Sequence, residues 1–387
     1  MEKYRLGDIC EIVSGSTPKT GVSEYWDGDK KWITPAEITD ESYIITDSVR
    51  KLTELGVAKT GLSSFPKGTV ILSSRAPIGK VAIAGCEMYC NQGFKNLICS
   101  QKIYNRYLYW FLKGNTEYLN SLGRGATFKE ISKQIVASIE INVPDMEQQM
   151  QAAENLERVS SIIRLRKQEL QKLDDLIKAR FVEMFVATDA ASDWPYCTIA
   201  DVSNDMRTGP FGSALHHDEF IDSGVFVLGL DNAVEDKLSY NRMRYITAEK
   251  YQELKRYTVY PGDVIITIMG TVGHSAVIPA DMPKAINTKH LACITPNAKM
   301  VNAQFLSCAF QVHPDIRAQL QKQCKGAIMD GLNLTIIKGL SFHIPPINLQ
   351  DRFVGFYEQV DKSKAAVQKA LDETQLLFDS LMQQYLA

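Results

Sequence analysis

The sequence predicts a mixed α/β (α+β) fold in which two homologous globular domains alternate with two long helices. The helices are expected to pack as an antiparallel coiled coil with pseudo-two-fold symmetry. Three observations predict this: a mid-chain stretch lacks proline and glycine, a second long helical stretch ends the chain, and the segments before them share landmarks in the same order. We expect globular domains at 1–144 and 189–346, and helices at 145–188 and 347–387.

The mid-chain stretch carries the seam of a coiled coil, because its apolar residues recur at alternating steps of three and four residues. These residues are Leu156, Val159, Ile163, Leu170, Leu173, Ile177 and Met184. Two arginines, Arg166 and Arg180, interrupt the seam. A seam of this kind requires a partner helix that buries it.

The C-terminal stretch is the expected partner, because it repeats the same spacing. Its apolar residues are Tyr357, Val360, Val367, Leu371, Phe378, Leu381 and Tyr385. Lys364 and Thr374 are its polar exceptions. We therefore expect the two stretches of one chain to pack against each other.

The two globular segments repeat each other's landmarks. The matching segments, first domain before second, are 65–73 and 260–267, 74–79 and 270–273, 90–95 and 286–290, 124–128 and 325–329, and the strands before Pro144 and Pro345. The offset between them drifts only from roughly 194 to 202 residues, which indicates a duplicated unit. Because the loops between the landmarks differ, we interpret the chain as one scaffold carrying two different binding surfaces.

Composition indicates a soluble globular protein. The chain has 387 residues, of which 45% are hydrophobic and 23% charged, and no apolar run reaches membrane-spanning length. The N-terminal residues lack the apolar core of a signal peptide, so we expect a cytoplasmic location. The eight cysteines are scattered without a CxxC pair, which favours free thiols over disulfides or metal ligands.

Several short motifs, in order and twice over, resemble the DNA specificity subunits of type I restriction–modification enzymes. They are the turns Ser14-Gly15-Ser16-Thr17-Pro18 and Thr208-Gly209-Pro210-Phe211-Gly212-Ser213, the core strands that follow Pro66 and Pro261, and Pro144 with Glu147-Gln148-Gln149 at the start of the first helix. The resemblance covers essentially the whole chain. The second boundary departs from the family, since Asn348-Leu349-Gln350 stands where a glutamate would be usual.

The resemblance implies that each globular domain is a target-recognition domain reading one half of a split sequence in double-stranded DNA. The helices would pack antiparallel, set the spacing between the halves and dock two methyltransferase subunits. Those subunits would bind S-adenosylmethionine, and a motor–nuclease subunit that uses ATP and magnesium could join. This chain itself would hold no catalytic residue, cofactor or metal.

Basic residues in or beside the repeated loops are the candidates for DNA contact, because reading a base or binding a phosphate requires a side chain that can reach a groove. The candidates are Arg75, Lys80, Lys95, Arg124 and Lys129 in the first domain, and Arg207, Lys289, His290 and Lys325 in the second. The alternative for each is an ordinary solvated charge. The net charge of −2 argues against a broadly basic surface, so we expect a local patch or help from partner subunits.

A search for an active site favours a protein without catalytic activity. Gly79-Lys80 lacks the remaining residues of a phosphate-binding loop, and His343-Ile344 precede Pro345-Pro346 where an adenine methyltransferase would have a polar acceptor. Glu253-Leu254-Lys255 lacks an acidic partner, and His216-His217 is interpreted as a polar loop rather than a metal site. Two alternatives remain: a free-standing nuclease or methyltransferase with fused recognition domains, and a tandem scaffold that binds protein or glycan.

Overall fold

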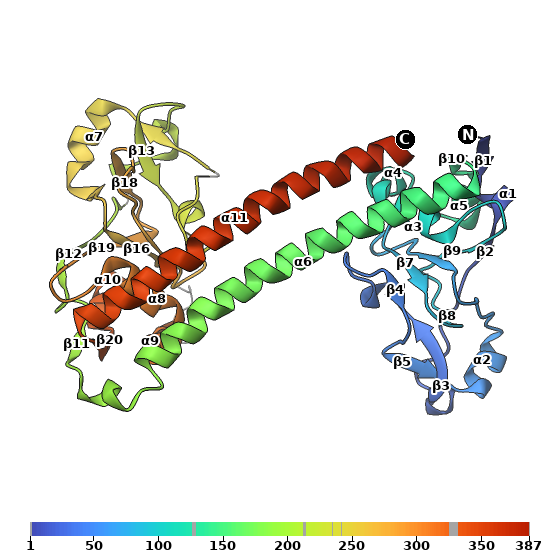
Figure 1. Cartoon of the computed structure of the whole chain (residues 1–387), viewed down its shortest axis with the longest axis horizontal. Coiled ribbons are helices and arrows are strands. Elements are labelled where there is room, and N and C mark those ends of the chain that lie inside the picture. Colours follow the sequence, from blue (N-terminus) through green and yellow to red (C-terminus); the bar gives the residue numbers. More distant parts are fainter. Residues whose placement is uncertain are drawn as a thin grey trace. The chain divides into compact units, whose positions relative to one another are not determined.

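The fold was analysed on a computed structural model of the chain. It describes residues 2–125, 129–211, 214–233, 235–240, 242–324 and 332–386. The chain divides into two compact units: unit 1 comprises Met1–Lys167 with Lys369–Ala387, and unit 2 comprises Gln168–Gln368. Each unit contains one globular segment and a part of each long helix (Figure 1).

The two long helices are α6, Met146–Phe185, and α11, Ile347–Leu386, each of 40 residues. Both lie within the ranges expected from the sequence. Three of the apolar residues of α6, Leu156, Ile163 and Ile177, are at most 8% exposed, and Leu156 and Ile177 pack into the cores of the two units. The predicted mixture of long helices and two α/β globular segments is therefore confirmed.

Side-chain contacts within each unit give the relative direction of α6 and α11. In unit 1, Asn155 Nδ2 donates to the Tyr385 hydroxyl at 3.0 Å, and Arg164 faces the same cavity as Gln375.

In unit 2, Lys364 forms an ion pair with Asp174, and the Phe181 and Phe353 rings lie 5.4 Å apart. In each unit, rising numbers along α6 meet falling numbers along α11. The two helices are therefore antiparallel in both units, as predicted.

The described residues of the globular part of unit 1 form three sheets. Strand β1 (Glu2–Arg5) pairs with β10 (Glu140–Val143). A five-stranded sheet has the order β2 (Cys10–Val13), β9 (Asn96–Cys99), β6 (Val70–Leu72), β7 (Val81–Ala84), β4 (Ile44–Ile45). A three-stranded sheet has the order β5 (Arg50–Leu52), β3 (Trp26–Ile33), β8 (Tyr89–Cys90). The helices are α1 (Leu6–Ile9), α2 (Glu54–Thr60), α3 (Asn105–Gly114), α4 (Thr116–Ser121) and α5 (Lys133–Ser138).

The globular part of unit 2 has the corresponding sheets. Strand β11 (Tyr196–Thr198) pairs with β20 (Ser341–His343). One four-stranded sheet has the order β12 (Ser203–Thr208), β19 (Leu291–Pro296), β16 (Val264–Thr267), β17 (Ser275–Val277). The other has the order β14 (Tyr245–Ile246), β13 (Val225–Leu228), β18 (Ala285–Asn287), β15 (Thr258–Val259). The helices are α7 (Ala248–Leu254), α8 (Ala303–Val312), α9 (Pro314–Cys324) and α10 (Leu334–Gly339).

The central strand of each unit is buried on both faces, because successive side chains of a strand point to opposite sides. In unit 1, Val70 and Leu72 of β6 belong to the core that also includes α3, while Ile71 belongs to a second core. In unit 2, Val264 and Ile266 of β16 lie in the helix-side core, while Ile265 lies in the other. A strand with apolar residues at consecutive positions is the sequence signature of this arrangement.

A buried glutamine joins each globular part to the first turn of its long helix. Gln149 is 1% exposed: its Nε2 donates to the carbonyls of Pro144 and Lys102 at 2.9 and 3.1 Å, and its Oε1 accepts from the Tyr104 N–H at 2.7 Å. The glutamine therefore satisfies three backbone groups at the junction.

Gln350, which is 0% exposed, makes the same three bonds to Pro345, Met300 and Asn302 at 2.8, 3.0 and 2.8 Å. The boundary between the second globular part and α11 thus keeps the buried glutamine that makes these bonds. The glutamate that it lacks corresponds to Glu147, which is exposed.

Candidate nucleic-acid interface

Each unit has an equivalent hairpin loop that follows its central strand, β6 in unit 1 and β16 in unit 2. In unit 1 the Ser73 hydroxyl accepts from the Lys80 N–H at 2.8 Å and donates to the Pro77 carbonyl at 2.7 Å. In unit 2 the Thr267 hydroxyl accepts from the His274 N–H at 3.0 Å and donates to the Thr271 carbonyl at 2.5 Å. The loops therefore share one hydrogen-bond pattern and differ in the side chains they present.

Glycine closes both hairpin loops. Gly79 and Gly273 have φ angles of 91° and 90°, in the left-handed region where residues with a Cβ are strained. Their N–H groups donate to the carbonyls of Ser73 and Thr267 at 3.0 and 2.9 Å. The Gly79 and Gly273 landmarks of the sequence repeat are therefore equivalent in three dimensions.

Two further segments meet each hairpin loop through backbone hydrogen bonds. In unit 1 the Ser74 N–H donates to Gly93 at 2.7 Å, and the Ile131 N–H donates to Ser74 at 3.0 Å. In unit 2 the Ile268 N–H donates to His290 at 2.9 Å, and the Leu332 N–H donates to Ile268 at 2.7 Å. Three loops that are distant in sequence thus converge in each unit, and they include most of the candidate DNA-contacting residues.

The turn that resembles the family's glycine motif belongs to the same cluster of loops. A side chain at Gly15 would overlap the Cys90 carbonyl, and one at Gly209 would overlap the backbone of Asn287 and Thr288. Cys90 and Asn287 end the equivalent strands β8 and β18. The glycines are therefore required because two backbone segments touch at this point.

In unit 1, two of the predicted cations meet at Glu130. Arg75 Nη1 lies 3.4 Å from Glu130 Oε2, and Lys95 Nζ lies 3.2 Å from Glu130 Oε1. Lys95 is only 7% exposed and also contacts the Ser74 hydroxyl at 3.3 Å, so its charge serves the interior of the loop cluster. Arg75 is partly exposed.

The three remaining candidates of unit 1 surround this group. The Arg124 backbone pairs with Glu130 through hydrogen bonds of 3.1 and 2.9 Å, which leaves the Arg124 side chain exposed. Lys129 is exposed beside it. Lys80 reaches from the end of the hairpin loop to the Pro35 carbonyl at 3.1 Å, which links the loop to a neighbouring turn.

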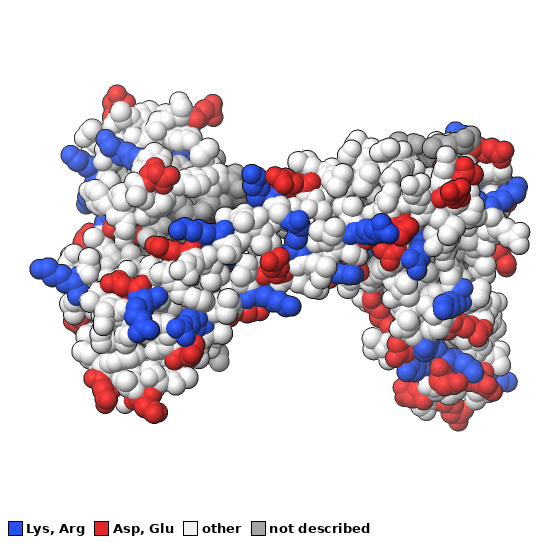
Figure 2. Space-filling model, in the orientation of Figure 1, with Lys and Arg blue, Asp and Glu red and all other residues white. Residues whose placement is uncertain are grey.

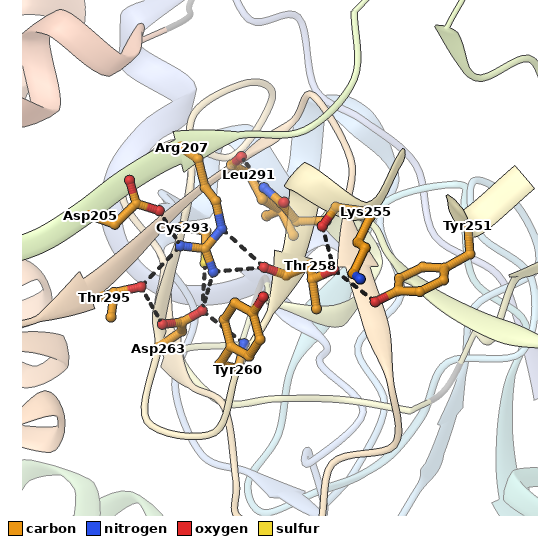
Figure 3. A network of polar contacts seen from close by, with 11 residues as sticks. Asp205, Arg207, Tyr251, Lys255, Thr258, Tyr260, Asp263, Leu291, Cys293 and Thr295 are labelled. Carbon is orange, nitrogen blue, oxygen red and sulfur yellow. Dashed lines mark hydrogen bonds and ion pairs between the residues drawn. The ribbon is translucent and has the colours of Figure 1, made fainter. Parts of the chain in front are cut away.

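In unit 2, Arg207 belongs to a largely buried network, shown in Figure 3. Its guanidinium pairs with Asp263 and Asp205, donates to Thr295 Oγ1 at 2.9 Å and to the Thr258 carbonyl at 3.0 and 2.7 Å, and lies near the Tyr260 ring. The Arg207 side chain is 12% exposed and Asp263 is 1% exposed. These contacts hold β12 against the strands beside it, so the geometry favours a structural role for Arg207.

The same network fixes a cysteine as a neutral thiol. Cys293 Sγ lies 3.2 Å from Asp263 Oδ2, and both burial and the Asp263 carboxylate raise the pKa of the Cys293 thiol. The thiol therefore donates to the carboxylate, which agrees with the prediction of free cysteines for this residue.

Lys289 and His290 lie on the segment that meets the hairpin loop of unit 2. Lys289 is exposed and His290 is partly exposed. Burial, followed by the charges of Lys289 and Arg244, lowers the pKa of His290. The imidazole is therefore held neutral near neutral pH. Lys325 falls outside the described residues.

Two arginines that the sequence did not single out, Arg242 and Arg244, meet at Asp231, and the charge of Arg244 acts on His290. Arg244 Nη2 is 2.5 Å from Asp231 Oδ2, and Arg242 Nη1 is 3.7 Å from the same oxygen. No landmark of the repeat marks them, because they lie in a stretch where the two domains differ. The only sequence signal is the spacing of two arginines around Met243 in a polar loop.

Charge is mixed rather than concentrated on the face of the molecule that Figure 2 shows. Figure 2 shows basic and acidic side chains interspersed on the visible face. This matches the net charge of −2 and indicates that any phosphate-binding surface is local. Long-range attraction to DNA is expected to be modest for this chain alone.

Within the described ranges, no group of three or more His, Cys, Asp and Glu side chains is arranged to hold a metal ion. His216 begins a short 3-10 turn, where its N–H donates to Glu219 Oε2 at 2.6 Å, and the His217 ring lies 5.7 Å from that of Phe220. Among the helices of the described residues, none is long and apolar enough to cross a membrane.

Comparison with solved structures supports the fold. The chain resembles a type I restriction–modification S subunit from M. genitalium with a TM-score of 0.60 and 15% identity, covering 100% of this chain and 96% of that one. It also resembles a chain from a structure of complex assembly and conformational transition in a type I restriction–modification system. That match has a TM-score of 0.60 and 17% identity, and covers 99% of this chain and 97% of the other.

Sequence relatives point the same way. The MjaIX type I restriction enzyme specificity subunit of Methanocaldococcus jannaschii is 38% identical over 185 residues, 47% of this chain and 43% of that protein. This chain thus aligns with less than half of that relative. The EcoBI specificity subunit of Escherichia coli is 21% identical over 77% of this chain and 67% of its own length.

The model of the family described as type I restriction modification DNA specificity domain matches twice, at residues 1–175 and 191–374. The two matches together cover most of both units. The chain therefore belongs to the family of type I restriction modification DNA specificity domains.

Proposed function

We propose that this chain is the sequence-specific DNA-binding subunit of a type I restriction–modification complex. Each globular part reads one half of a bipartite target in double-stranded DNA, and α6 and α11 set the spacing between the halves. Family membership supports the class of function. The repeated cluster of loops supports the assignment of one reading surface to each unit.

One observation carries the proposal: the same hydrogen-bonded hairpin loop occurs in both units with different side chains around it. In protein–DNA complexes, phosphate contacts fix the position of the protein and base contacts specify the sequence. Two domains with one backbone scaffold and different loop side chains are therefore suited to recognising two different DNA sequences. A single ligand surface would not need the frame twice.

The partners follow from the family. Two methyltransferase subunits dock on the helices and bind S-adenosylmethionine, and motor–nuclease subunits use ATP and magnesium. The exposed apolar side chains of α6, such as Ile162 at 43% and Leu165 at 60%, are suited to such docking. In this proposal the chain itself is not an enzyme, and the complex acts in the cytoplasm.

Selection on randomised duplexes tests the proposal directly. The purified chain is mixed with its methyltransferase subunit, and bound DNA is recovered and sequenced. The expected result is a consensus of two short blocks separated by unspecified bases, with affinity that falls steeply as salt rises. Recovery of one continuous block would contradict the two-reader proposal, and turnover of DNA by the chain alone with cofactor and magnesium would contradict the absence of catalysis.

A further inference from the structure

In each unit an arginine in or beside the candidate interface forms an ion pair with a partly exposed carboxylate. In unit 1, Arg75 Nη1 lies 3.4 Å from Glu130 Oε2, and in unit 2, Arg244 Nη2 lies 2.5 Å from Asp231 Oδ2. Arg75 comes from the hairpin loop after β6, whereas Arg244 precedes β14. The same chemical pair therefore arises twice from positions that are not equivalent in the repeat.

We propose that Arg75 and Arg244 each read a guanine in one half of the target, and that Glu130 and Asp231 are positioning residues that orient them. This inference rests on the proposed function and adds to it the residues and the base. Arginine recognises guanine by donating two hydrogen bonds to O6 and N7, which requires a fixed orientation of the guanidinium plane.

The carboxylates of Glu130 and Asp231 bear on the role of the arginines, because a negative charge opposes the binding of phosphate. DNA is a polyanion, so an acidic side chain within the interface weakens non-specific attraction. The two pairs are partly exposed, with side-chain exposures of 35% for Arg75, 36% for Glu130, 22% for Arg244 and 41% for Asp231, so the ion pairs add little to folding. Orientation of the arginine fits both facts, and in unit 1 Glu130 also compensates the charge of the buried Lys95.

In unit 1 the carboxylate is itself fixed. The backbone of Glu130 pairs with that of Arg124, and its Oε1 is bound by the buried Lys95 at 3.2 Å. One oxygen is therefore occupied, and the other faces Arg75. Glu130 cannot turn away from Arg75 without leaving the buried Lys95 charge uncompensated.

In unit 2 the carboxylate lies on a short turn that a side-chain hydrogen bond closes. Asp231 sits in the 3-10 turn Leu230–Asn232, where the buried Asn232 side chain accepts from the Gly229 N–H at 2.8 Å. The Arg244 guanidinium lies over Gly229, where any side chain would overlap it. Arg242 contacts the same Asp231 oxygen at 3.7 Å, so a second cation stands beside the pair.

Selection on randomised duplexes with the complete complex tests the inference, comparing the unmodified chain with Arg75→Lys and Arg244→Lys. Lysine keeps the charge but loses the two-pronged donor. We expect each variant to lose about five- to 150-fold of discrimination at one G·C pair. The loss should fall in one half of the target only, with the salt dependence of binding unchanged.

The carboxylate variants give a signature that a structural role does not predict. Glu130→Gln and Asp231→Asn should reduce preference at the same base pair as their arginine partners, yet bind random DNA more tightly because a negative charge is removed. Glu140→Gln on β10, which breaks an exposed ion pair with Lys3 on β1, is the matched control and should change neither. Thermal melting identifies a folding defect in Glu130→Gln, which leaves the buried Lys95 without its ion pair. The ion pairs that the structure describes for Asp231 are with Arg242 and Arg244, which are exposed and partly exposed, so Asp231→Asn provides a test with less risk to folding.

The outcomes separate this inference from the proposed function. A bipartite consensus that stays unchanged in both lysine variants would overturn the inference and leave the proposed function intact. Loss of preference in both halves from one arginine variant would also overturn it. If the unmodified complex selects no bipartite sequence, the proposed function itself fails.

Discussion

Gln149 and Gln350 show how single residues fix the junction between a globular part and a long helix. Each satisfies three backbone groups at a buried junction. Replacing Gln149 with Leu should lower the free energy of unfolding of unit 1 by about 3 kcal/mol, because buried partners are left without hydrogen bonds. Chemical denaturation checks this, and the exposed neighbour Gln148→Leu is the control that should change little. Equal losses from both variants would contradict the assignment.

Glycine at the loop turn is a second test at the residue scale. Gly15→Ala should displace the turn from Cys90, because the new methyl group overlaps a backbone carbonyl. We expect weaker DNA binding together with a lower melting temperature of unit 1. Gly21→Ala is the matched control, since a methyl group added there would meet no atom within 4 Å. Unchanged binding in Gly15→Ala would show that the turn does not position the interface.

His313 predicts a pH dependence of stability. Burial lowers the pKa of His313, whose Nδ1 accepts from the Asp315 N–H at 3.3 Å. As pH falls through the ordinary pKa of histidine, about 6.5, the unfolded chain binds a proton that the folded chain does not, so stability decreases. His313→Gln should therefore reduce the loss of unfolding free energy between pH 7 and pH 5, measured by denaturation at each pH. A steeper loss in the variant would contradict this.

Sequence reasoning located the converging loops but could not rank their charges. Arg75 is partly exposed and Lys129 is exposed, whereas the charges of Lys95 and Arg207 are largely buried in ion pairs with Glu130 and Asp263. An arginine in a buried network and an arginine in a groove look alike in sequence, because the difference lies in residues brought near by the fold. Arg244 was missed for the same reason, since its partner Asp231 has no recognisable motif.

At the scale of elements, periodicity sufficed for the longest features. Both long helices fall within their predicted ranges, because 40 residues of sustained apolar spacing leave little ambiguity. The central strands β6 and β16 were also predicted from continuous apolar runs. Short edge strands such as β4 and β14, with two residues each, were not predicted, because their pairing is set by neighbours rather than by local preference.

The two long helices give a prediction of spacing. Adding about seven residues, two turns, to both helices after Lys167 and before Lys369 lengthens each by about 10 Å. If the helices set the gap, the two blocks of the target should move apart by about three base pairs, at ~3.4 Å per step. Selection on randomised duplexes measures the gap. An unchanged gap in a folded variant would count against the helices as spacers.

At the scale of the whole molecule, duplication explains both what was predictable and what was not. The frame is constrained twice by the same backbone contacts, so its landmarks recur and reveal the fold. The loops between landmarks differ, and we propose that they carry the different specificities, so no pattern in one half predicts the other. The net charge of −2 fits this division, since a chain that binds DNA within a larger complex need not supply all the attraction itself.

Exchange of one globular part tests the central claim most directly. The segment 189–346 is replaced by that of a relative, and methylated sites are mapped across the genome of a host that carries the methyltransferase subunit. Two independent readers predict that one block of the methylated sequence changes while the other block and the gap stay the same. A change in both blocks, or in neither while methylation continues, would contradict the account.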